Sequence, residues 1–354
     1  RPDLAPAAGH TVKLTIDKKL QFITENALSK AVELYKAKGG TAVVMDPYSG
    51  DILAMASAPD FDPNNFGAAG LDALRNRSVV DAYEPGSTIK VFTMAAALQH
   101  RVVRLGENIY CENGMIEIGR HKIKDSHPHK WLDLTGIIQK SSNIGATKIA
   151  QRLGKRRLYT ALRLFGFGHK TGLLLPGERS GHLGRWRRWS EAKLSNVSFG
   201  QGMTATSVQM AAALSALANG GLLFRPRIAL EIRDANGAPV VHYRKRWRRV
   251  VSQRVTRRVL DMMATVVKKG GTGEEAALAG YSVAGKTGTA QKVAATSAKR
   301  ARAQAEALAE AARLGKPLPR KKTGYAEDLY LASFMGVVPA SRPRLAIVVA
   351  VDEP

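Results

Sequence analysis

The hydrophobic pattern divides the chain into strand-like segments at both ends and helical segments between them. Short apolar runs bounded by glycine, proline or aspartate predict five strands, namely Thr41–Met45, Ile52–Ser57, Ser282–Gln291, Leu331–Val338 and Arg344–Val351. The first two are joined by Asp46-Pro47-Tyr48-Ser49-Gly50, which is typical of a hairpin turn. We therefore expect an α+β fold in which both ends of the chain form one five-stranded antiparallel sheet, flanked by helices.

Helical periodicity accounts for most of the middle of the chain. Asp17 is expected to cap a helix whose buried face holds Leu20, Ile23, Ala27, Leu28, Ala31 and Leu34. Further helices are expected at Leu132–Lys140, Ile144–Leu153, Leu158–Phe165, Ala205–Ala218 and Val255–Val267. Additional strand-like or extended segments are expected at Thr11–Ile16, Thr171–Pro176 and, around a turn, Arg225–Val241.

The domain organisation follows from the same pattern. Residues 1–10 are rich in proline and alanine and are interpreted as a linker, and residues 11–354 as one domain. Residues 294–322 contain few large apolar residues, so we expect a surface helix or a mobile insertion there. The chain starts without methionine and is interpreted as part of a longer protein.

One predicted helix combines an apolar surface with two polar side chains. It begins at the Pro85-Gly86 turn, runs to about Leu98 and carries Ser87 and Lys90 three residues apart, on the same face. Burial lowers the pKa of a lysine, which makes it a plausible base for a neighbouring serine. Because short motifs often occur by chance and a serine at a helix start is usually a cap, this pair alone does not establish catalysis.

The composition is that of a globular protein, with 45% hydrophobic and 23% charged residues, but the net charge is +25. The main clusters of basic residues are three runs, Lys155-Arg156-Arg157, Arg185-Trp186-Arg187-Arg188-Trp189 and Arg244-Lys245-Arg246-Trp247-Arg248-Arg249. Such runs suit nucleic acid or an anionic membrane surface. No nucleic-acid-binding signature accompanies them, so we interpret them as solvated arginine and expect no nucleic-acid partner.

The sequence gives little indication of a metal site, a disulfide bond or a transmembrane helix. Cys111 is the single cysteine, which excludes an internal disulfide, and we expect it to be buried or half-buried. His121, His127 and His129 lack ligand spacing and are interpreted as an exposed loop, not a zinc site. No window approaches 18 uncharged apolar residues, so the sequence predicts no transmembrane helix or signal peptide in this chain.

Two further motifs are weak alone. Ser141 and Asn143 stand between two predicted helices, where Ser141 can relay a proton and Asn143 can donate to a substrate amide or to Lys90; the alternative is helix capping. The segment Lys286-Thr287-Gly288-Thr289 lies on a predicted strand, where a lysine and two hydroxyls suit a carboxylate and Gly288 permits close backbone approach.

Together the motifs supply a nucleophile, a base, a proton relay, an oxyanion hole and a grip on substrate. Ser-x-x-Lys, Ser-x-Asn and Lys-Thr-Gly, in this order, resemble penicillin-binding proteins and class A β-lactamases. The chain resembles the transpeptidase domain of a class B penicillin-binding protein, closest to the cell-division type, over most of residues 11–354. Other segments that carry the resemblance are Thr41–Asp46 with Gly50–Ala56, Phe199–Gly202, Lys286–Lys292 and Ala332–Gly336.

The resemblance implies a D,D-transpeptidase that cross-links peptidoglycan stem peptides and is acylated by β-lactams. It implies catalytic roles for Ser87, Lys90, Ser141 and Asn143. It implies substrate-binding roles for Lys286, Thr287, Gly288 and Thr289, and no metal or cofactor. Ser87 is the expected nucleophile and Lys90 the base, with the backbone N–H groups of Ser87 and Thr289 as the oxyanion hole.

The resemblance also implies a setting for the domain. Members of this family carry an N-terminal membrane anchor and pedestal and usually a C-terminal helix beyond the last strand, and we expect none of these within residues 1–354. The expected location is therefore the outer side of the cytoplasmic membrane, with a membrane glycosyltransferase and division proteins as partners. Division rather than elongation is the expected role.

Two other functions stay open at this stage. A β-lactamase or β-lactam sensor of the same fold would need a glutamate to activate water, and Glu178 follows the Ser-x-Asn motif, although within a transpeptidase-like Pro-Gly-Glu-Arg-Ser-Gly segment. A catalytically silent scaffold would use the basic runs to recruit partners. The intact Ser87, Lys90 and Lys286 favour an enzyme.

Overall fold

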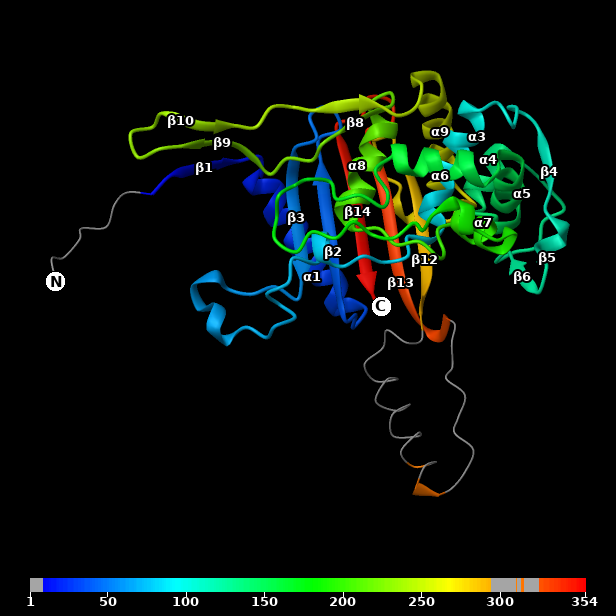
Figure 1. The fold of residues 1–354 in the computed structure, drawn as a ribbon, viewed down its shortest axis with the longest axis horizontal. Helices are drawn as coiled ribbons and strands as arrows, with labels where there is room; N and C mark the ends of the chain where they lie inside the picture. Colours follow the sequence, from blue (N-terminus) through cyan, green and yellow to red (C-terminus); the bar gives the residue numbers. More distant parts are fainter. Residues whose placement is uncertain (1–8, 294–309, 311–312, 315–324) are drawn as a thin grey trace.

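The computed structural model describes residues 9–293, 310, 313–314 and 325–354. Its centre is a five-stranded antiparallel sheet in the order β12-β13-β14-β2-β3 (Figure 1). The strands are β2 (Gly39–Met45), β3 (Ile52–Ala58), β12 (Ala284–Val293), β13 (Tyr325–Val338) and β14 (Leu345–Asp352). The prediction of one sheet built from both ends of the chain is confirmed, and β14 joins the two ends by pairing with both β13 and β2.

Both faces of the sheet are covered, so alternate residues of β2 enter different cores. Ala42 packs with Leu28 of α1 (Lys18–Leu34), whereas Val43 and Met45 belong to the main core. In that main core lies α8 (Ser207–Ala218), which is buried along its whole length. A capping box between Thr206 and Gln209 starts α8.

Six of the other described helices form a block beside the sheet, next to β12 (Figure 1). They are α3 (Lys90–Gln99), α4 (Leu134–Gln139), α5 (Asn143–Leu153), α6 (Lys155–Leu164), α7 (Glu191–Ser198) and α9 (Gln253–Val266). The short helix α2 (Arg77–Val80) lies apart from this block and packs against β2, β3 and α8. The expected helices near α4, α5, α6, α8 and α9 are present. The sequence prediction missed α2 and α7, which are short, and did not anticipate that the Ser87 helix begins with a 3-10 turn, η2 (Gly86–Ile89).

The predicted buried face of α1 is wrong in part. Ile23 and Leu34 are 61% and 74% exposed, and Ala27 is also exposed. The helix turns Gln21 toward the sheet instead, and the Gln21 side-chain amide exchanges two hydrogen bonds, of 2.8 and 2.9 Å, with the backbone of Met55. Because β3 is an edge strand among the described residues, these bonds satisfy backbone groups of Met55 that face away from β2, and they hold this face of α1 against the sheet.

Small sheets surround the core. The strands β1 (Thr11–Leu14), β9 (Ala229–Arg233) and β10 (Pro239–His242) form an arm that projects from the main sheet (Figure 1). Three two-stranded sheets pair β4 (Asn108–Tyr110) with β7 (Trp131–Asp133), β5 (Met115–Ile118) with β6 (His121–Lys124), and β8 (Leu222–Phe224) with β11 (Trp247–Arg249). For Thr171–Pro176 the sequence predicted a strand or an extended segment, and the structure has no strand there. Most of the predicted linker 1–10 and of the insertion 294–322 lies outside the described residues.

Candidate active site

Ser87 lies where an irregular segment becomes helix α3. Pro85 and Gly86 lead into η2, and the backbone N–H of Lys90 bonds to the carbonyl of Ser87 as the α-helix begins. Thr88 donates its hydroxyl to the Pro85 carbonyl oxygen at 2.7 Å, which fixes the turn. Ser87 is half-buried, whereas Lys90 is 1% exposed, so the serine is accessible to a ligand and the lysine is not.

The ammonium or amine nitrogen of Lys90 lies against three oxygens. Its Nζ is 3.0 Å from Ser87 Oγ and 3.1 Å from Ser141 Oγ, and it also donates to the Ser141 carbonyl oxygen. The expected proximity of Ser87 and Lys90 is therefore present, and Ser141 lies in the same cluster. Because a carbonyl oxygen can only accept, any lone pair on a neutral Lys90 must face one of the two hydroxyls.

The loop that carries Ser141 connects α4 and α5. Ser141 has a positive φ of 59°, an uncommon conformation for a residue other than glycine, and it aims both its carbonyl and its hydroxyl at the Lys90 nitrogen. Ser142 is the cap of α5, since its Oγ accepts from the Gly145 N–H at 2.9 Å. Backbone strain at a site of clustered polar groups is often associated with function.

Asn143 takes part in this loop differently from Ser141. Its side-chain nitrogen donates to the Lys124 carbonyl oxygen at 2.8 Å, and its backbone N–H donates to Asp125 at 2.5 Å. Among the hydrogen bonds of the described residues, none joins the Asn143 side chain to Lys90. The side chain borders the loop, where its remaining amide hydrogen and its oxygen can meet a ligand.

Sequence reasoning missed Asp125, which holds the loop in place. One carboxylate accepts from Ser142 Oγ at 2.6 Å and from the backbone N–H groups of Asn143 and Ile144. Charge-assisted bonds of this kind fix the start of α5 strongly. A lone aspartate in a histidine-containing loop carried no recognisable motif, so only the fold reveals this role.

The strand β12 brings Lys286 into the same cluster. Lys286 is fully buried, and its Nζ lies 2.9 Å from Ser141 Oγ and 3.0 Å from the Thr287 carbonyl oxygen. The Thr287 hydroxyl bonds to that of Thr272 at 2.7 Å, a second residue that the sequence did not single out. Thr289 is exposed on the same strand, which pairs with β13 and lies at the edge of the sheet within the described part of the chain.

Glycines allow this edge strand and the Ser87 turn to meet. A Cβ on Gly288 would lie 2.8 Å from the Pro85 carbonyl oxygen, so the expected close backbone approach at this position is present. A Cβ on Gly200, which has a φ of +83°, would lie 2.1 Å from the Gly86 carbonyl oxygen. A side chain at either position would collide with the turn that leads to Ser87 and displace it.

The two buried lysines depart from ordinary lysine behaviour. Burial lowers the pKa of Lys286 to about 7. Burial and the neighbouring Lys286 charge lower the pKa of Lys90 well below its ordinary value, while Asp125 opposes this shift. Two ammonium groups in one desolvated cluster repel each other, so we assign the neutral form to Lys90.

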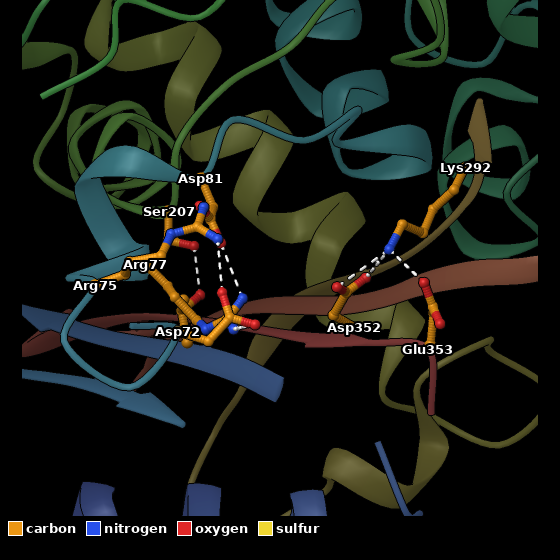
Figure 2. A network of polar contacts seen from close by, with 9 residues as sticks. Asp72, Arg75, Arg77, Asp81, Ser207, Lys292, Asp352 and Glu353 are labelled. Carbon is orange, nitrogen blue, oxygen red and sulfur yellow. Dashed lines mark hydrogen bonds and ion pairs between the residues drawn. The ribbon is translucent and has the colours of Figure 1, made fainter. Parts of the chain in front are cut away.

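Contacts outside the cluster anchor the segment that leads to Ser87. Tyr83 exchanges backbone hydrogen bonds of 3.0 and 2.9 Å with Ala205, just before α8, and its side chain bonds to Ser207. Arg77, which is buried, pairs with Asp81 at 3.0 Å, and Figure 2 shows these two beside Ser207. The nucleophile turn therefore starts from a segment tied to the core helix α8.

An ion-pair cluster crosses the sheet near the end of β12. The Nζ of Lys292 lies 2.9 Å from Asp352 and 2.6 Å from Glu353, at the end of β14 (Figure 2). Only β13 separates these two strands in the sheet. The cluster therefore ties the strand that carries Lys286 to the interior of the sheet, and the family-like segment Lys286–Lys292 ends on this anchor.

Three further sequence predictions concern metal ligands, the single cysteine and membrane-spanning helices. Within the described part of the chain, no group of three or more histidine, cysteine, aspartate or glutamate side chains is placed to hold a metal ion. Cys111 is buried and unpaired with another cysteine, as expected. None of the described helices is long and apolar enough to cross a membrane.

Comparison with known proteins gives a consistent result. A family model described as the penicillin binding protein transpeptidase domain matches residues 40–354. The chain is 34% identical over 350 residues to the probable peptidoglycan D,D-transpeptidase PenA of Neisseria gonorrhoeae, covering 99% of this chain and 54% of that protein. It is 36% identical over 347 residues to peptidoglycan D,D-transpeptidase FtsI of Escherichia coli, covering 98% and 52%. The chain thus spans about half the length of the curated relatives it matches.

Solved structures show the same relationship. Penicillin binding protein 3 of Mycobacterium tuberculosis, in complex with aztreonam, aligns with a TM-score of 0.87 at 32% identity and covers 100% of this chain and 75% of that chain. The apo transpeptidase domain of Burkholderia pseudomallei penicillin-binding protein 3 aligns with a TM-score of 0.77 at 32% identity, covering 97% and 88%.

Proposed function

The chain belongs to the family of penicillin-binding protein transpeptidase domains, and we propose that it is a peptidoglycan D,D-transpeptidase acting through an acyl-enzyme on Ser87. The single observation that carries the proposal is the cluster in which Lys90 Nζ lies 3.0 Å from Ser87 Oγ, while Ser141 Oγ lies 3.1 Å from Lys90 and 2.9 Å from Lys286. Three segments that are distant in sequence meet at one half-buried hydroxyl.

The first half-reaction uses Lys90 as the base. A neutral Lys90 donates its two hydrogens to the carbonyl and the hydroxyl of Ser141, and its lone pair then accepts the Ser87 proton. Ser87 Oγ attacks the carbonyl carbon of the penultimate D-alanine of a stem peptide. The C–N bond breaks, the proton passes to the leaving amine, and the terminal D-alanine departs.

The second half-reaction reverses these proton movements. An amine on a neighbouring stem peptide attacks the Ser87 ester, the C–Oγ bond breaks, and the proton returns to Ser87. Ser141 is suited to relay protons, because its hydroxyl contacts both Lys90 and Lys286. A β-lactam acylates Ser87 in the same way, but its amide nitrogen stays attached after ring opening.

The edge strand β12 supplies the substrate site. Lys286, Thr287 and Thr289 form the site for the terminal carboxylate: the two threonines contact it, and the buried Lys286 attracts it through its charge. The carboxylate raises the pKa of Lys286 again and favours its ammonium form. Gly288 lets the peptide backbone lie close to the strand, and Asn143 donates to a substrate amide. The backbone N–H groups of Ser87 and Thr289 form the oxyanion hole, which stabilises the tetrahedral intermediate. These roles rest on the family and on the positions of the residues around the cluster.

Further parts of the proposal concern the whole protein. By kinship with the peptidoglycan D,D-transpeptidases, we place the domain on the outer side of the cytoplasmic membrane and assign it to septal wall synthesis. A membrane glycosyltransferase and division proteins are its proposed partners. Peptidoglycan stem peptides are its substrates, and β-lactams are its covalent inhibitors.

A β-lactamase of the same fold is disfavoured by Glu178. That carboxylate accepts from the backbone N–H and hydroxyl of Thr171, at 2.6 and 2.5 Å, and from the N–H of Gly172 at 3.3 Å. It is buried and stabilises the turn at Thr171–Gly172. A glutamate held in this way is not free to activate a deacylating water.

The experiment that tests the proposal measures both products of the reaction. Purified protein is given a donor stem peptide ending in D-alanyl-D-alanine and an acceptor amine, and released D-alanine and the cross-linked product are quantified by mass spectrometry. We expect one D-alanine per cross-link or hydrolysed donor, and neither product with Ser87→Ala. Turnover that survives in Ser87→Ala would refute the proposed nucleophile.

A further inference from the structure

The longest arginine-rich run lines a groove that the proposed reaction does not use. Two cavities, of about 390 and about 640 Å³, share Arg225, Pro226 and Arg246 in their walls and therefore adjoin each other. Six basic residues line this pair of cavities, which we call the arginine groove: Lys170, Arg225, Arg227, Arg244, Arg246 and Arg248. Its walls come from the segment after α6, the strand β8 with the residues that follow it, and the connection between β10 and β11.

The positive charge of the groove is largely uncompensated. None of the described residues that line it is an aspartate or glutamate. Arg225 donates to the Gly172 carbonyl oxygen at 3.0 and 2.7 Å, and Arg248 donates to that of Leu164 at 3.0 Å. These neutral acceptors position the guanidinium groups without cancelling their charge. Arg227 differs, because it forms an ion pair with Asp51 at 2.6 Å.

The pKa of His169, at one end of the arginine groove, is lowered by burial and by nearby positive charges. It lines the smaller cavity, and its Nδ1 lies 3.0 Å from the Arg163 guanidinium. Burial lowers the pKa of His169, and the charges of Arg163 and Arg248 lower it further. Arg163 in turn is bound to the Gly168 carbonyl oxygen at 2.6 Å. A histidine beside this end of the groove is therefore kept neutral, as a positive potential requires.

The floor of the groove is apolar. Phe165, Leu223 and Phe224 line the smaller cavity, and Leu173 and Ile228 line the larger one. At the rim, the Trp247 side chain is 60% exposed. Apolar floors with polar groups at the edge are typical of ligand and peptide grooves. The complementary ligand is elongated and carries both acidic and apolar side chains.

We propose that the arginine groove binds an acidic segment of a partner protein in which carboxylates alternate with apolar residues. The carboxylates meet the guanidinium groups, which accept bidentate pairing, and the apolar side chains enter the floor. A bilayer contacts protruding side chains, whereas these cations surround a recess. Single-stranded nucleic acid would stack its bases on rings such as Tyr243 and Trp247 in the lining, so an oligonucleotide is included in the test below.

The test uses a synthetic peptide of alternating aspartate and leucine, blocked at both ends, with an alternating serine–leucine peptide as its neutral counterpart. Binding is followed by tryptophan fluorescence, because Trp247 lies at the rim, and Trp247→Phe identifies its share of the signal. The double variant Arg244→Glu/Arg246→Glu reverses the groove charge. The matched control Arg156→Glu/Arg157→Glu makes the same charge change at exposed residues of α6 that do not line the groove.

We expect saturable binding of the aspartate–leucine peptide, weakened at least about tenfold by the groove variant and less than about twofold by the control variant, because charge pairs in a groove act locally. Penicillin acylation of both variants verifies that they fold, and Arg244→Gln/Arg246→Gln replaces the reversal if it does not. Equal weakening in both variants would show diffuse attraction and overturn the proposal. So would binding of only phosphatidylglycerol vesicles or only oligothymidylate, or absence of peptide binding at low salt.

Discussion

Lys90 and Lys286 share one hydrogen-bond partner, the hydroxyl of Ser141, at 3.1 and 2.9 Å from their Nζ atoms. Their side chains are both buried, one on the helix that follows the nucleophile and one on the edge strand. Two buried ammonium groups around one hydroxyl repel each other, and deprotonation of one of them removes this repulsion. The arrangement thus prepares a base before substrate binds.

Replacing Lys90 removes the proposed base without changing the volume of the site greatly. We expect Lys90→Met to slow acylation by benzylpenicillin by about 10²–10⁴-fold, the usual contribution of general-base catalysis. Lys90→Arg should be comparably slow, because a guanidinium keeps its proton. Stopped-flow or quenched labelling with a fluorescent penicillin measures the rate, and thermal unfolding verifies the fold. A Met variant that retains the wild-type rate would exclude Lys90 as the base.

The depressed pKa of Lys286 predicts a pH-dependent stability. The folded-state pKa is about 7, and the unfolded value is about 10.4. Between these values the unfolded chain binds a proton that the folded chain does not, so the free energy of unfolding rises with pH. Relative to Lys286→Met, the wild type should gain about 1 kcal/mol per pH unit between about pH 7 and 9. Urea unfolding at several pH values measures this, and parallel curves for the two proteins would contradict it.

Gly200 tests the steric contact behind the nucleophile turn. We expect Gly200→Ala to lose most penicillin acylation, because its Cβ would lie 2.1 Å from the Gly86 carbonyl oxygen. Gly237 is the matched control, since its φ of +82° is nearly the same but nothing lies within 4 Å of its added Cβ. Gly237→Ala should cost about 1 kcal/mol of stability from backbone strain alone and leave the acylation rate unchanged. Equal acylation rates in the two variants would disprove the contact argument.

The Lys292 anchor predicts a loss of stability at the edge strand. Its partners Asp352 and Glu353 are largely buried with it, at 21% and 25% side-chain exposure. We expect Lys292→Met to lower the free energy of unfolding by about 1–3 kcal/mol, because it leaves two carboxylates without their cation. Lys122→Met, which breaks the exposed pair with Glu117, should change it by less than about 0.5 kcal/mol. Chemical unfolding of both variants measures these changes. Similar losses in the free energy of unfolding would show that the Lys292 cluster contributes no more than an exposed ion pair.

The sequence predicted the sheet and the three motifs because each depends on local patterns. The hydrophobic runs at both ends of the chain identify the strands, and the family prediction from the Ser87, Ser141 and Lys286 motifs is confirmed by the match over residues 40–354. The rotation of α1 could not be predicted, because it depends on Gln21 reaching the Met55 backbone of an edge strand. Such a contact exists only after the sheet has formed.

The part of the site that was not predicted also depends on contacts that exist only in the folded chain. Asp125 and Thr272 act through partners 17 or 15 residues away, Ser142 and Thr287, and no spacing rule connects them. Of the two partners predicted for Asn143, a substrate amide or Lys90, the second is not among its hydrogen bonds in the described residues, and its side chain donates to the Lys124 carbonyl oxygen. The arginine runs were interpreted as solvated surface, and only the fold shows that the longest of them borders a recess.

The mass of the intact protein after exposure to benzylpenicillin tests the central claim most directly. We predict a mass increase equal to one whole penicillin molecule, because ring opening releases no fragment, with the adduct mapped by proteolysis to the peptide that contains Ser87. The adduct should be long-lived and absent from Ser87→Ala. An unmodified mass for the folded wild type, or an adduct on another residue that persists in Ser87→Ala, would contradict the account.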